Sequence, residues 1–501
     1  MQAEPGSSGA FGDSQEHCWR LVAFLEGNQA AGCTHGELEE LMDTDGRELL
    51  RQMYQNHLEL RAQREARLPA VVDTSGIDRP RAEAGHIRHL ETTLGVVAVT
   101  RIAYRRPGEE NLHPADADLN LPGQRQSHGL RRLAAIESSR GSFDDAVGAI
   151  ARATGQKLGK RQVEGLAQAA AEDVDAFYDA RRPTVGDPDD TVVLSVDGKG
   201  IVMRREDLRP ATAAAARGGR KKLSTRLSKG EKANRKRMAE LGTVYDATPA
   251  PRTPADILVE TGGPPGDVTP GPKANGKWLT ASVVKDATTV VAKVFDEAER
   301  RDPAHGRTWV GLVDGNRQQI TAITRQARTR GVEVHIVIDF IHVMEYLWKA
   351  VWCLYNEGDP AAETWVRKMA LGVLKGKATV VAGIIRRAAT RAGLVPHQRG
   401  GVDACAKYLS NKSPYLDYPR ALKEGWPIAT GVIEGACRHI VKDRMDLTGA
   451  RWGLEGAEAV LKLRVLHSNG DWNAYWRFHL RQERRRVHES RYANGVIPRA
   501  A

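Results

Sequence analysis

The chain has 501 residues, of which 41% are hydrophobic and 27% are charged, and its formal net charge is +11 at pH 7. This length exceeds what one core usually supports, so we expect roughly two to four domains. No stretch approaches the roughly 20 consecutive apolar residues that a spanning helix needs, and the first residues lack the pattern of a secretory signal. Composition therefore argues against a membrane protein, predicts a cytoplasmic one, and favours a polyanionic partner.

Residues 1–69 predict an amino-terminal helical module. Two apolar patterns there have helical spacing, and Thr34 and Glu37 have the spacing of a capping box. Residues 70–126 predict a connector, because β-branched residues concentrate on both sides of Gly95 and a Pro-bounded loop follows. We therefore expect two short strands and a turn between two helical modules.

Residues 127–186 predict a helix-turn-helix-like DNA-binding module. Val147 and Ile150 lie on one side of a Gly-containing turn and are expected to pack against Val163 and Leu166 on the other side. The second helix of such a motif contacts DNA near its start. The predicted DNA-binding residues at that start are Lys157, Lys160 and Arg161. The alternative is a helical hairpin whose charged residues are only solvated.

A new domain is predicted from residue 187 to residue 358. The segment TVVLSVDGKG is a nearly continuous apolar run that ends at Asp197, which is typical of a strand buried on both faces. Further strands are expected at 242–245, 279–284, 309–313 and 332–338, with a helix at 287–300. Strands that lead into helices indicate an α/β fold.

Residues 204–240 form a predicted basic insertion in this domain. The segment from Arg217 to Arg237 contains ten Lys or Arg residues and a single acid, Glu231. Such a biased segment is unlikely to pack into a core, so it is either a solubilising loop or a region that contacts phosphates. Its predicted DNA-binding residues are Arg220, Lys221 and Lys222.

The last third of the chain is predicted to be helical. An amphipathic helix is expected from Ile341 to about Tyr355. An α-helical insertion is predicted at 359–428, final core helices that carry Glu434 at 429–482, and a basic tail at 483–501.

Three acidic residues stand out by their setting. Asp197 and Asp314 each end an apolar run and precede a glycine, and α/β proteins place their chemistry at the carboxyl ends of strands. Glu434 lies where Thr430 could cap a helix that carries the acid inward. The alternatives are that both Asp-Gly pairs are tight turns and that Glu434 only complements a helix dipole.

Three carboxylates would suit two Mg²⁺ or Mn²⁺ ions, because hard cations prefer oxygen ligands. Two such ions about 3.5 to 4 Å apart can activate a water or a 3′-hydroxyl and stabilise the leaving oxygen. The sequence contains no convincing Ser/His or Cys/His arrangement. The pattern therefore favours phosphoryl transfer without a nucleophile from the protein.

Several motifs resemble those of the ISKra-type insertion-sequence transposases, the ISKra-four group. These motifs are VDGKG, LVDGN, DFIHVMEYLWKA and GVIEGACRHIVKDRMDLTGARWGLEGAEAVLKLR, with LNLP and SFDDA upstream. The resemblance implies an RNase H-like catalytic core, related to that of Mutator-like transposases, with an α-helical insertion before the final Glu. It also implies that Asp197, Asp314 and Glu434 are the catalytic and metal-binding triad.

Mutator-like enzymes resemble this chain in a strand followed by a Cys-x-x-His pair, and the matching residues here are Asp339 and His342. The departure from Cys to Asp leaves the role of the pair open. Asp339 also ends an apolar run and so competes with Asp314 for the second metal position, although the resemblance favours Asp314. His342 could contact the scissile phosphate, orient a carboxylate, or be a structural histidine.

A cluster of charged residues follows Glu434 at helical spacing and could contact DNA phosphates. The predicted DNA-binding residues of this cluster are Arg438, Lys442 and Arg444, beside His439 and Asp443. Trp452 is expected to pack, although it could also stack on a base.

These expectations together describe a DNA transposase that binds the terminal inverted repeats of an insertion sequence and catalyses metal-dependent strand cleavage and strand transfer. Its partners would be double-stranded DNA, both the repeats and the target, and at least one further copy of the chain for synapsis. The alternatives are an RNase H-like nuclease or resolvase and a non-catalytic DNA-binding regulator derived from a transposase.

Overall fold

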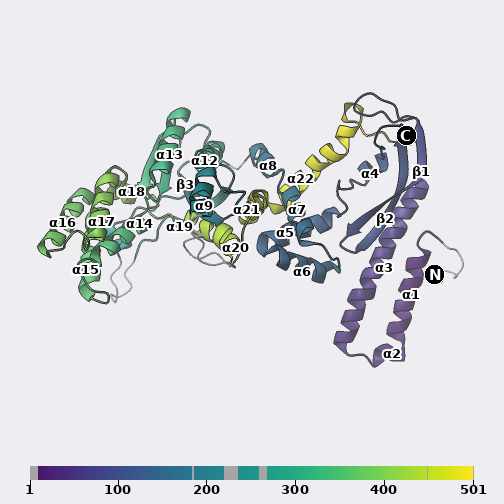
Figure 1. Cartoon of the computed structure of the whole chain (residues 1–501), viewed down its shortest axis with the longest axis horizontal. Coiled ribbons are helices and arrows are strands. Elements are labelled where there is room, and N and C mark those ends of the chain that lie inside the picture. Colours follow the sequence, from purple (N-terminus) through teal and green to yellow (C-terminus); the bar gives the residue numbers. More distant parts are fainter. Residues whose placement is uncertain (1–8, 183–184, 219–234, 259–267, 448, 500–501) are drawn as a thin grey trace. The chain divides into compact units, whose positions relative to one another are not determined.

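The computed structural model describes residues 9–182, 185–218, 235–258, 268–447 and 449–499. The chain divides into two compact units; Figure 1 shows all elements, coloured along the sequence from purple to yellow. Unit 1 comprises Met1–Ala180 and Asp471–Ala501, and unit 2 comprises Arg181–Gly470. Residues 219–234 of the predicted basic insertion, including Arg220, Lys221 and Lys222, lie outside the described residues.

Unit 1 begins with the helices α1 (Gly12–Glu26), α2 (Asn28–Ala31) and α3 (His35–Arg64). The predicted capping box is confirmed, because the Thr34 side chain accepts from the Glu37 amide and the Glu37 carboxylate accepts from the Thr34 amide. The strands β1 (Arg81–Thr92) and β2 (Gly95–Arg105) then pair antiparallel. The predicted strand, turn and strand are therefore present, although β1 begins before the β-branched segment.

Three helices, α5 (His128–Arg140), α6 (Phe143–Thr154) and α7 (Lys160–Ala170), share one hydrophobic core. Ile150 of α6 packs with Val163 and Leu166 of α7, and Val147 is partly buried against them, as expected. Gly155 ends α6 with a φ of 69°, a left-handed conformation that favours glycine. The predicted helix, glycine-containing turn and second helix are thus present, and the two helices pack on each other.

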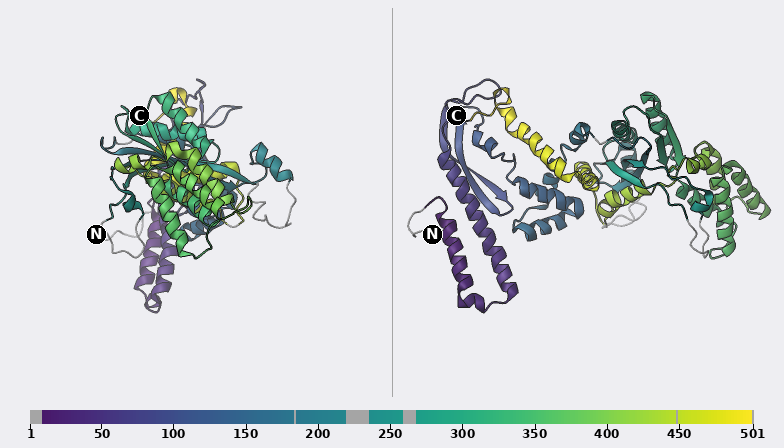
Figure 2. Two further views of the ribbon diagram at one scale, coloured as in Figure 1. Left: turned by 90° about the vertical axis from the view of Figure 1, so that its left-hand side faces the viewer. Right: turned by 180° about the vertical axis from the view of Figure 1, so that it is seen from behind.

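The carboxyl-terminal segment belongs to unit 1 together with α4 (Pro114–Asp118) and α8 (Val174–Ala180). Its main helix, α22 (Trp472–Val487), is drawn in yellow in Figures 1 and 2, and the short helices η3 (Glu489–Arg491) and η4 (Ala493–Gly495) follow it. This grouping differs from the expectation that residues up to 482 complete the core and that a tail follows. The reason is a set of long-range contacts, among them the buried pair of Arg131 and Glu483.

Unit 2 is built on a five-stranded sheet with the order β5-β4-β3-β6-β7. The strands are β3 (Thr191–Val202), β4 (Lys236–Ala247), β5 (Ala274–Ser282), β6 (Trp309–Val313) and β7 (Val334–Ile338). β3, β4 and β5 form an antiparallel meander, whereas β6 and β7 run parallel to β3. The unit is therefore α/β with a mixed sheet, as the alternation of strands and helices predicted.

Several helices pack against this sheet. α12 (Ala287–Arg301) contacts β3, β4 and β5, α13 (Arg317–Arg330) contacts β6 and β7, and α21 (Leu454–Ser468) contacts β5. α12 matches its prediction. α13 was not predicted, although Ile320 and Ile323 are buried on one of its faces.

Residues between the last strand and Glu434 are helical, as predicted for the insertion. The helices are α14 (Phe340–Val351), α15 (Pro360–Leu374), α16 (Ala378–Arg391), α17 (Gly400–Lys412), η1 (Ser413–Tyr415) and α18 (Tyr418–Lys423). α17 packs on both α14 and α16, and these helices are grouped in Figure 1. The short helices α9 (Pro210–Gly218) and α11 (Pro254–Ile257) lie in the loops around β4.

Glu434 lies on α19 (Gly431–Ala436), which continues into a π-helical turn, Cys437–Lys442, and then into α20 (Asp443–Met445). A π turn places successive side chains at spacings that an α-helix does not allow, and such turns are frequent at functional sites. The α-helical spacing assumed for this segment from its sequence is therefore wrong across the π turn.

Candidate carboxylate site

Asp197 and Asp314 lie next to each other where the parallel pairing of β3 with β6 ends. The pairing of β3 with β6 ends at Ser195 and Leu312, so each acid follows the last paired residues of its strand by two positions. Asp197 does not end β3, however, because the strand continues to Val202 by pairing with β4. The interpretation of Asp197 and the following glycine as a tight turn is therefore wrong, and Asp197 is a strand residue.

The carboxylate of Asp197 is held by two neutral donors. Its Oδ1 accepts from the Gly198 amide at 2.7 Å, and its Oδ2 accepts from the thiol of Cys437 at 3.2 Å. Burial raises the pKa of Asp197, these hydrogen bonds partly offset that effect, and the charge of Asp314 raises the pKa further. Burial also raises the pKa of the Cys437 thiol, so the thiol stays protonated and can donate. This bond ties the π turn to the central strand.

The loop that carries Asp314 is fixed from two sides. The hydroxyl of Tyr408 donates to the backbone oxygen of Asp314 at 3.0 Å, and the Asn316 amide donates to its Oδ1 at 2.7 Å. Gly315 between them has a φ of 94°, and a Cβ there would lie 2.9 Å from the Tyr408 oxygen. A glycine is therefore required here both by conformation and by space. Asp314 itself remains partly exposed.

Asp339, the competitor for the second metal position, caps a helix. It is 1% exposed, and its Oδ1 accepts from the Ile341 amide at 2.9 Å as the N-cap of α14. Its Oδ2 accepts from the hydroxyl of Thr430 at 2.6 Å. Burial raises the pKa of Asp339, and the nearby charge of Glu434 raises it as well. Both carboxylate oxygens of Asp339 are thus engaged within the fold.

Thr430 stands between Asp339 and Glu434. Its hydroxyl lies 2.6 Å from Asp339 Oδ2 and 3.0 Å from Glu434 Oε1, but it has a single proton to donate. If both acids were charged, one of them would face an oxygen lone pair. Thr430 does not cap α19 through its side chain, contrary to expectation, and it instead orients the two carboxyl groups.

Glu240 is a further acid of this site that the sequence analysis missed. It lies on β4 directly opposite Gly198, and a Cβ on that glycine would lie 3.2 Å from Glu240 Oε2. Burial raises the pKa of Glu240, and the charge of Asp197 contributes to this shift. The available signal was an acid within the otherwise apolar segment MAELGTVY. Its proximity to Asp197 depends on the strand register, which the sequence does not reveal.

The residues of the basic cluster after Glu434 differ in their exposure to solvent. Arg438 and Lys442 are exposed, whereas Arg444 is 2% exposed and its guanidinium lies 4.7 Å from the ring centre of Trp452. The prediction that Arg444 contacts phosphates is therefore wrong, because its side chain is buried by a stacking partner. Trp452 packs as expected and donates from its indole to the Met445 oxygen.

His342 is partly exposed on α14. Its Nδ1 lies 3.6 Å from a Glu345 oxygen, and its ring lies 5.6 Å from the ring of Tyr346 and 6.0 Å from that of Tyr408. Because Tyr408 holds the Asp314 loop, His342 borders the site through aromatic contacts.

The predicted DNA-binding residues of the three-helix module are all exposed at the start of α7. Lys160 forms an ion pair with Asp144 of α6. Lys157 and Arg161 flank this pair on the surface of unit 1. The start of α7 thus presents three cationic side chains to solvent.

Oxygen donors of this kind suit a hard divalent cation. Within the described part of the chain, however, no group of three or more His, Cys, Asp or Glu side chains is close enough to hold a metal ion. The acids instead form two neighbouring pairs, Asp197 with Asp314 and Asp339 with Glu434. The charges of both Asp197 and Glu434 raise the pKa of Cys437, which connects the pairs.

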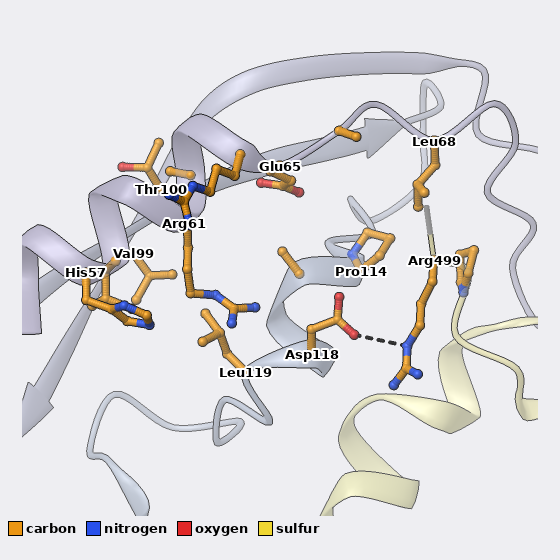
Figure 3. A pocket seen from close by; sticks show the side chains of 16 residues that line it. His57, Arg61, Glu65, Leu68, Val99, Thr100, Pro114, Asp118, Leu119 and Arg499 are labelled. Carbon is orange, nitrogen blue, oxygen red and sulfur yellow. Dashed lines mark ion pairs between the residues drawn. The ribbon is translucent and has the colours of Figure 1, made fainter. Parts of the chain in front are cut away.

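A separate cavity of about 530 Å³ lies in unit 1, between α3, β2, α4 and the carboxyl-terminal segment (Figure 3). Asp118 and Arg499 form an ion pair of 3.3 Å at its wall. Burial raises the pKa of Glu65, whose Oε2 accepts from the Ile102 amide at 3.0 Å. None of the residues predicted for catalysis or DNA binding lines this cavity.

No protein-family model matches the chain, and no curated protein matches its sequence. Among the described helices, none is both long enough and apolar enough to cross a membrane.

Proposed function

We propose that the chain is a DNA transposase of the DDE type, which binds the terminal inverted repeats of an insertion sequence and cleaves and joins DNA by metal-dependent phosphoryl transfer. The observation that carries this proposal is the pair of Asp197, on β3, and Asp314, directly after the adjacent parallel strand β6; the charge of Asp314 raises the pKa of Asp197. Burial raises the pKa of Asp197, and its hydrogen-bond donors are a thiol and an amide. A divalent cation would relieve this repulsion.

The proposed core is RNase H-like. In support, the sheet continues from an antiparallel three-stranded meander into two parallel strands, and the first acid lies on the central strand. The helical segment before Glu434 supports the expected α-helical insertion. The raised pKa values of Asp197, Glu240 and Asp339 further support a functional site at this edge, because such values concentrate where acids do chemistry.

In the proposed mechanism, Asp197, Asp314 and Glu434 would hold two Mg²⁺ or Mn²⁺ ions, which would supply activation of a water or a 3′-hydroxyl and stabilisation of the leaving oxygen. Asp339 has a different role, because it caps α14 and accepts the Thr430 hydroxyl. Thr430 orients the exposed Glu434, and Cys437 anchors the same helix to Asp197.

Recognition of the element ends is assigned to unit 1. The start of α7 carries Lys157, Lys160 and Arg161 on the surface, where a recognition helix contacts DNA. The net charge of +11 favours phosphate binding. Bringing two ends together requires at least a dimer.

The test uses the genomic DNA that flanks the gene. Inverted repeats on both sides would supply labelled end duplexes, and we expect nicked and joined products with Mg²⁺ or Mn²⁺. Asp197→Asn should abolish both products and leave end binding unchanged, because it removes a charge in unit 2, whereas end binding is assigned to unit 1. Cleavage without joining would favour a nuclease or resolvase, and binding without cleavage would favour a regulator.

A further inference from the structure

Two tyrosines of the helical insertion bind the ends of neighbouring strands. The hydroxyl of Tyr408, on α17, donates to the backbone oxygen of Asp314 at 3.0 Å, directly after β6. The hydroxyl of Tyr418, the first residue of α18, donates to the backbone oxygen of Ile338 at 2.9 Å, the last residue of β7. The insertion therefore contacts the sheet at the two strand ends that carry candidate acids.

The Tyr408 side chain is itself held in place. Its ring stacks on Tyr346 of α14, with ring centres 4.0 Å apart and an angle of 15° between the rings. About two turns earlier on α17 the two helices approach closely, since a Cβ on Gly401 would lie 2.0 Å from the Lys349 backbone oxygen. Burial raises the pKa of Tyr408, so its hydroxyl stays protonated and can donate. The packing of α17 on α14 thus determines where this hydroxyl lies.

The hydroxyl anchors Asp314 by its main chain and leaves its carboxylate available. Asp314 is partly exposed, and its Oδ1 accepts from the Asn316 amide at 2.7 Å. A Cβ on Gly315 would lie 2.9 Å from the Tyr408 oxygen, so the glycine leaves the space that the hydroxyl occupies. Because the tyrosine is a neutral donor to a backbone oxygen, it fixes the loop without compensating the negative charge of the acid.

We propose that Tyr408 is a positioning residue for Asp314 and that the helical insertion thereby completes the acid site at the sheet, an inference that rests on the proposed function. A carboxylate binds a cation more tightly when the surrounding structure already holds it in the coordinating position, because less conformational freedom is lost on binding. The hydrogen bond from α17 supplies this order at Asp314. The insertion is thus a functional part of the site and not only a connection between β7 and Glu434.

The experiment measures Mn²⁺ binding to the full chain without DNA, by electron paramagnetic resonance of the free ion. The part of the binding that Asp314→Asn removes belongs to the site. Tyr408→Phe should weaken this part about tenfold, because groups that orient a metal ligand typically contribute about 10- to 100-fold to affinity. The matched control is Tyr418→Phe, which removes the same kind of hydrogen bond from β7 and should leave Mn²⁺ affinity unchanged.

Cleavage of end DNA gives a second readout. Tyr408→Phe should raise the Mn²⁺ concentration that gives half the maximal rate about tenfold and change the rate at saturating Mn²⁺ much less, because the ligands themselves are intact. Tyr346→Leu removes the stacking partner and keeps the hydroxyl, so it should weaken Mn²⁺ binding in the same direction by a smaller factor. This variant also tests the inference if Tyr408→Phe does not fold.

The outcomes separate this inference from the proposed function. Equal Mn²⁺ affinity of wild type and Tyr408→Phe, or of wild type and Tyr346→Leu where the first variant does not fold, overturns the inference and leaves the proposed function standing. Equal losses in Tyr408→Phe and Tyr418→Phe also overturn it, because the tyrosines would then act only through the stability of the unit. A wild type whose Mn²⁺ binding does not depend on Asp314 overturns both.

Discussion

In unit 1, buried carboxylates face cations, whereas at the sheet edge of unit 2 they face neutral donors. Asp173 accepts from His479 at 2.6 Å and from Arg486, and Glu483 accepts from Arg131 at 2.6 Å. Burial by itself would raise the pKa of both acids, but the hydrogen bonds and charges of these partners lower it. Their negative charge is therefore compensated within the fold.

Asp197 and Asp339 are also largely removed from water, but their side-chain donors are the thiol of Cys437 and the hydroxyl of Thr430. The pKa of each acid is raised, first by burial and then by a neighbouring acid. Burial alone thus does not distinguish a structural acid from a functional one. The distinction lies in the hydrogen-bond donors, because an acid held only by neutral donors has a charge that a bound cation can still stabilise.

The largest expected effect separates the two candidates for the second metal position. Asp314→Asn should reduce cleavage of labelled end DNA at least about 1000-fold, or ~4 kcal/mol, because it removes a metal ligand. Asp339→Asn should reduce the cleavage rate by no more than about tenfold, since an asparagine oxygen can still cap α14. The reverse order of the two variants would assign the position to Asp339.

Breaking a compensated pair in unit 1 should destabilise the fold. Arg131→Met leaves Glu483 buried without its main partner, which should cost about 3 kcal/mol in urea unfolding at pH 7.5. The partner lowers the pKa of Glu483 in wild type, so its contribution is present at neutral pH and is lost as pH falls. The deficit should therefore shrink at acid pH. An equal deficit at both pH values would mean that lost packing, not charge, is responsible.

Removing the shared hydroxyl should affect catalysis moderately. Thr430→Val keeps the shape of the side chain but leaves Asp339 and Glu434 without their common donor. We expect about a tenfold lower kcat for cleavage, corresponding to ~1.4 kcal/mol, with little change in DNA affinity. Thr430→Ser should restore the rate. A Ser variant as slow as the Val variant would indicate that the methyl group matters and not the hydroxyl.

Two Asp→Asn variants in unit 2 should change thermal stability in opposite directions. The pKa of Asp197 is raised, so its charge disfavours folding increasingly as pH rises above the unfolded value, and Asp197→Asn should raise Tm in EDTA at pH 7. The pKa of Asp302 is lowered, because hydrogen bonds from Trp309 and the backbone outweigh burial. Asp302→Asn should therefore lower stability by about 1 kcal/mol. Scanning calorimetry would measure both Tm values, and changes of Tm in the same direction for the two variants would contradict the prediction.

The smallest effects concern the cations of α7. Lys157→Ala and Arg161→Ala should each weaken DNA binding a few-fold and reduce the salt slope by about one. Lys160→Ala should have a smaller effect, since Lys160 already pairs with Asp144. Anisotropy titrations across a salt series would measure this difference. Equal losses of DNA affinity for all three variants would show that the ion pair between Lys160 and Asp144 opens when DNA binds.

Local patterns predicted the elements well. The capping box at Thr34, the packing of Ile150 against Val163 and the apolar run through Val193 depend on residues close in sequence, and the structure contains all three. The ends of the elements were less predictable. β3 continues past Asp197 because it pairs with β4, a partner whose register no local pattern specifies.

Contacts between distant residues account for the errors. Arg444 has the composition of a phosphate contact but is buried by Trp452, and Glu240 reaches the site only through its position opposite Gly198. The last helix joined unit 1 because Glu483 meets Arg131 across 352 residues. None of these contacts leaves a periodic signal in the sequence.

The sequence by itself determined the α/β character of unit 2, the helix, turn and helix that form α6 and α7, and the candidacy of Asp197, Asp314 and Glu434, because these follow from local periodicity and from motifs. Only the tertiary structure decided which acids are compensated. Whether a buried carboxylate meets an arginine or a thiol depends on chain segments hundreds of residues apart. Burial and partner together set its pKa, and both are properties of the folded chain.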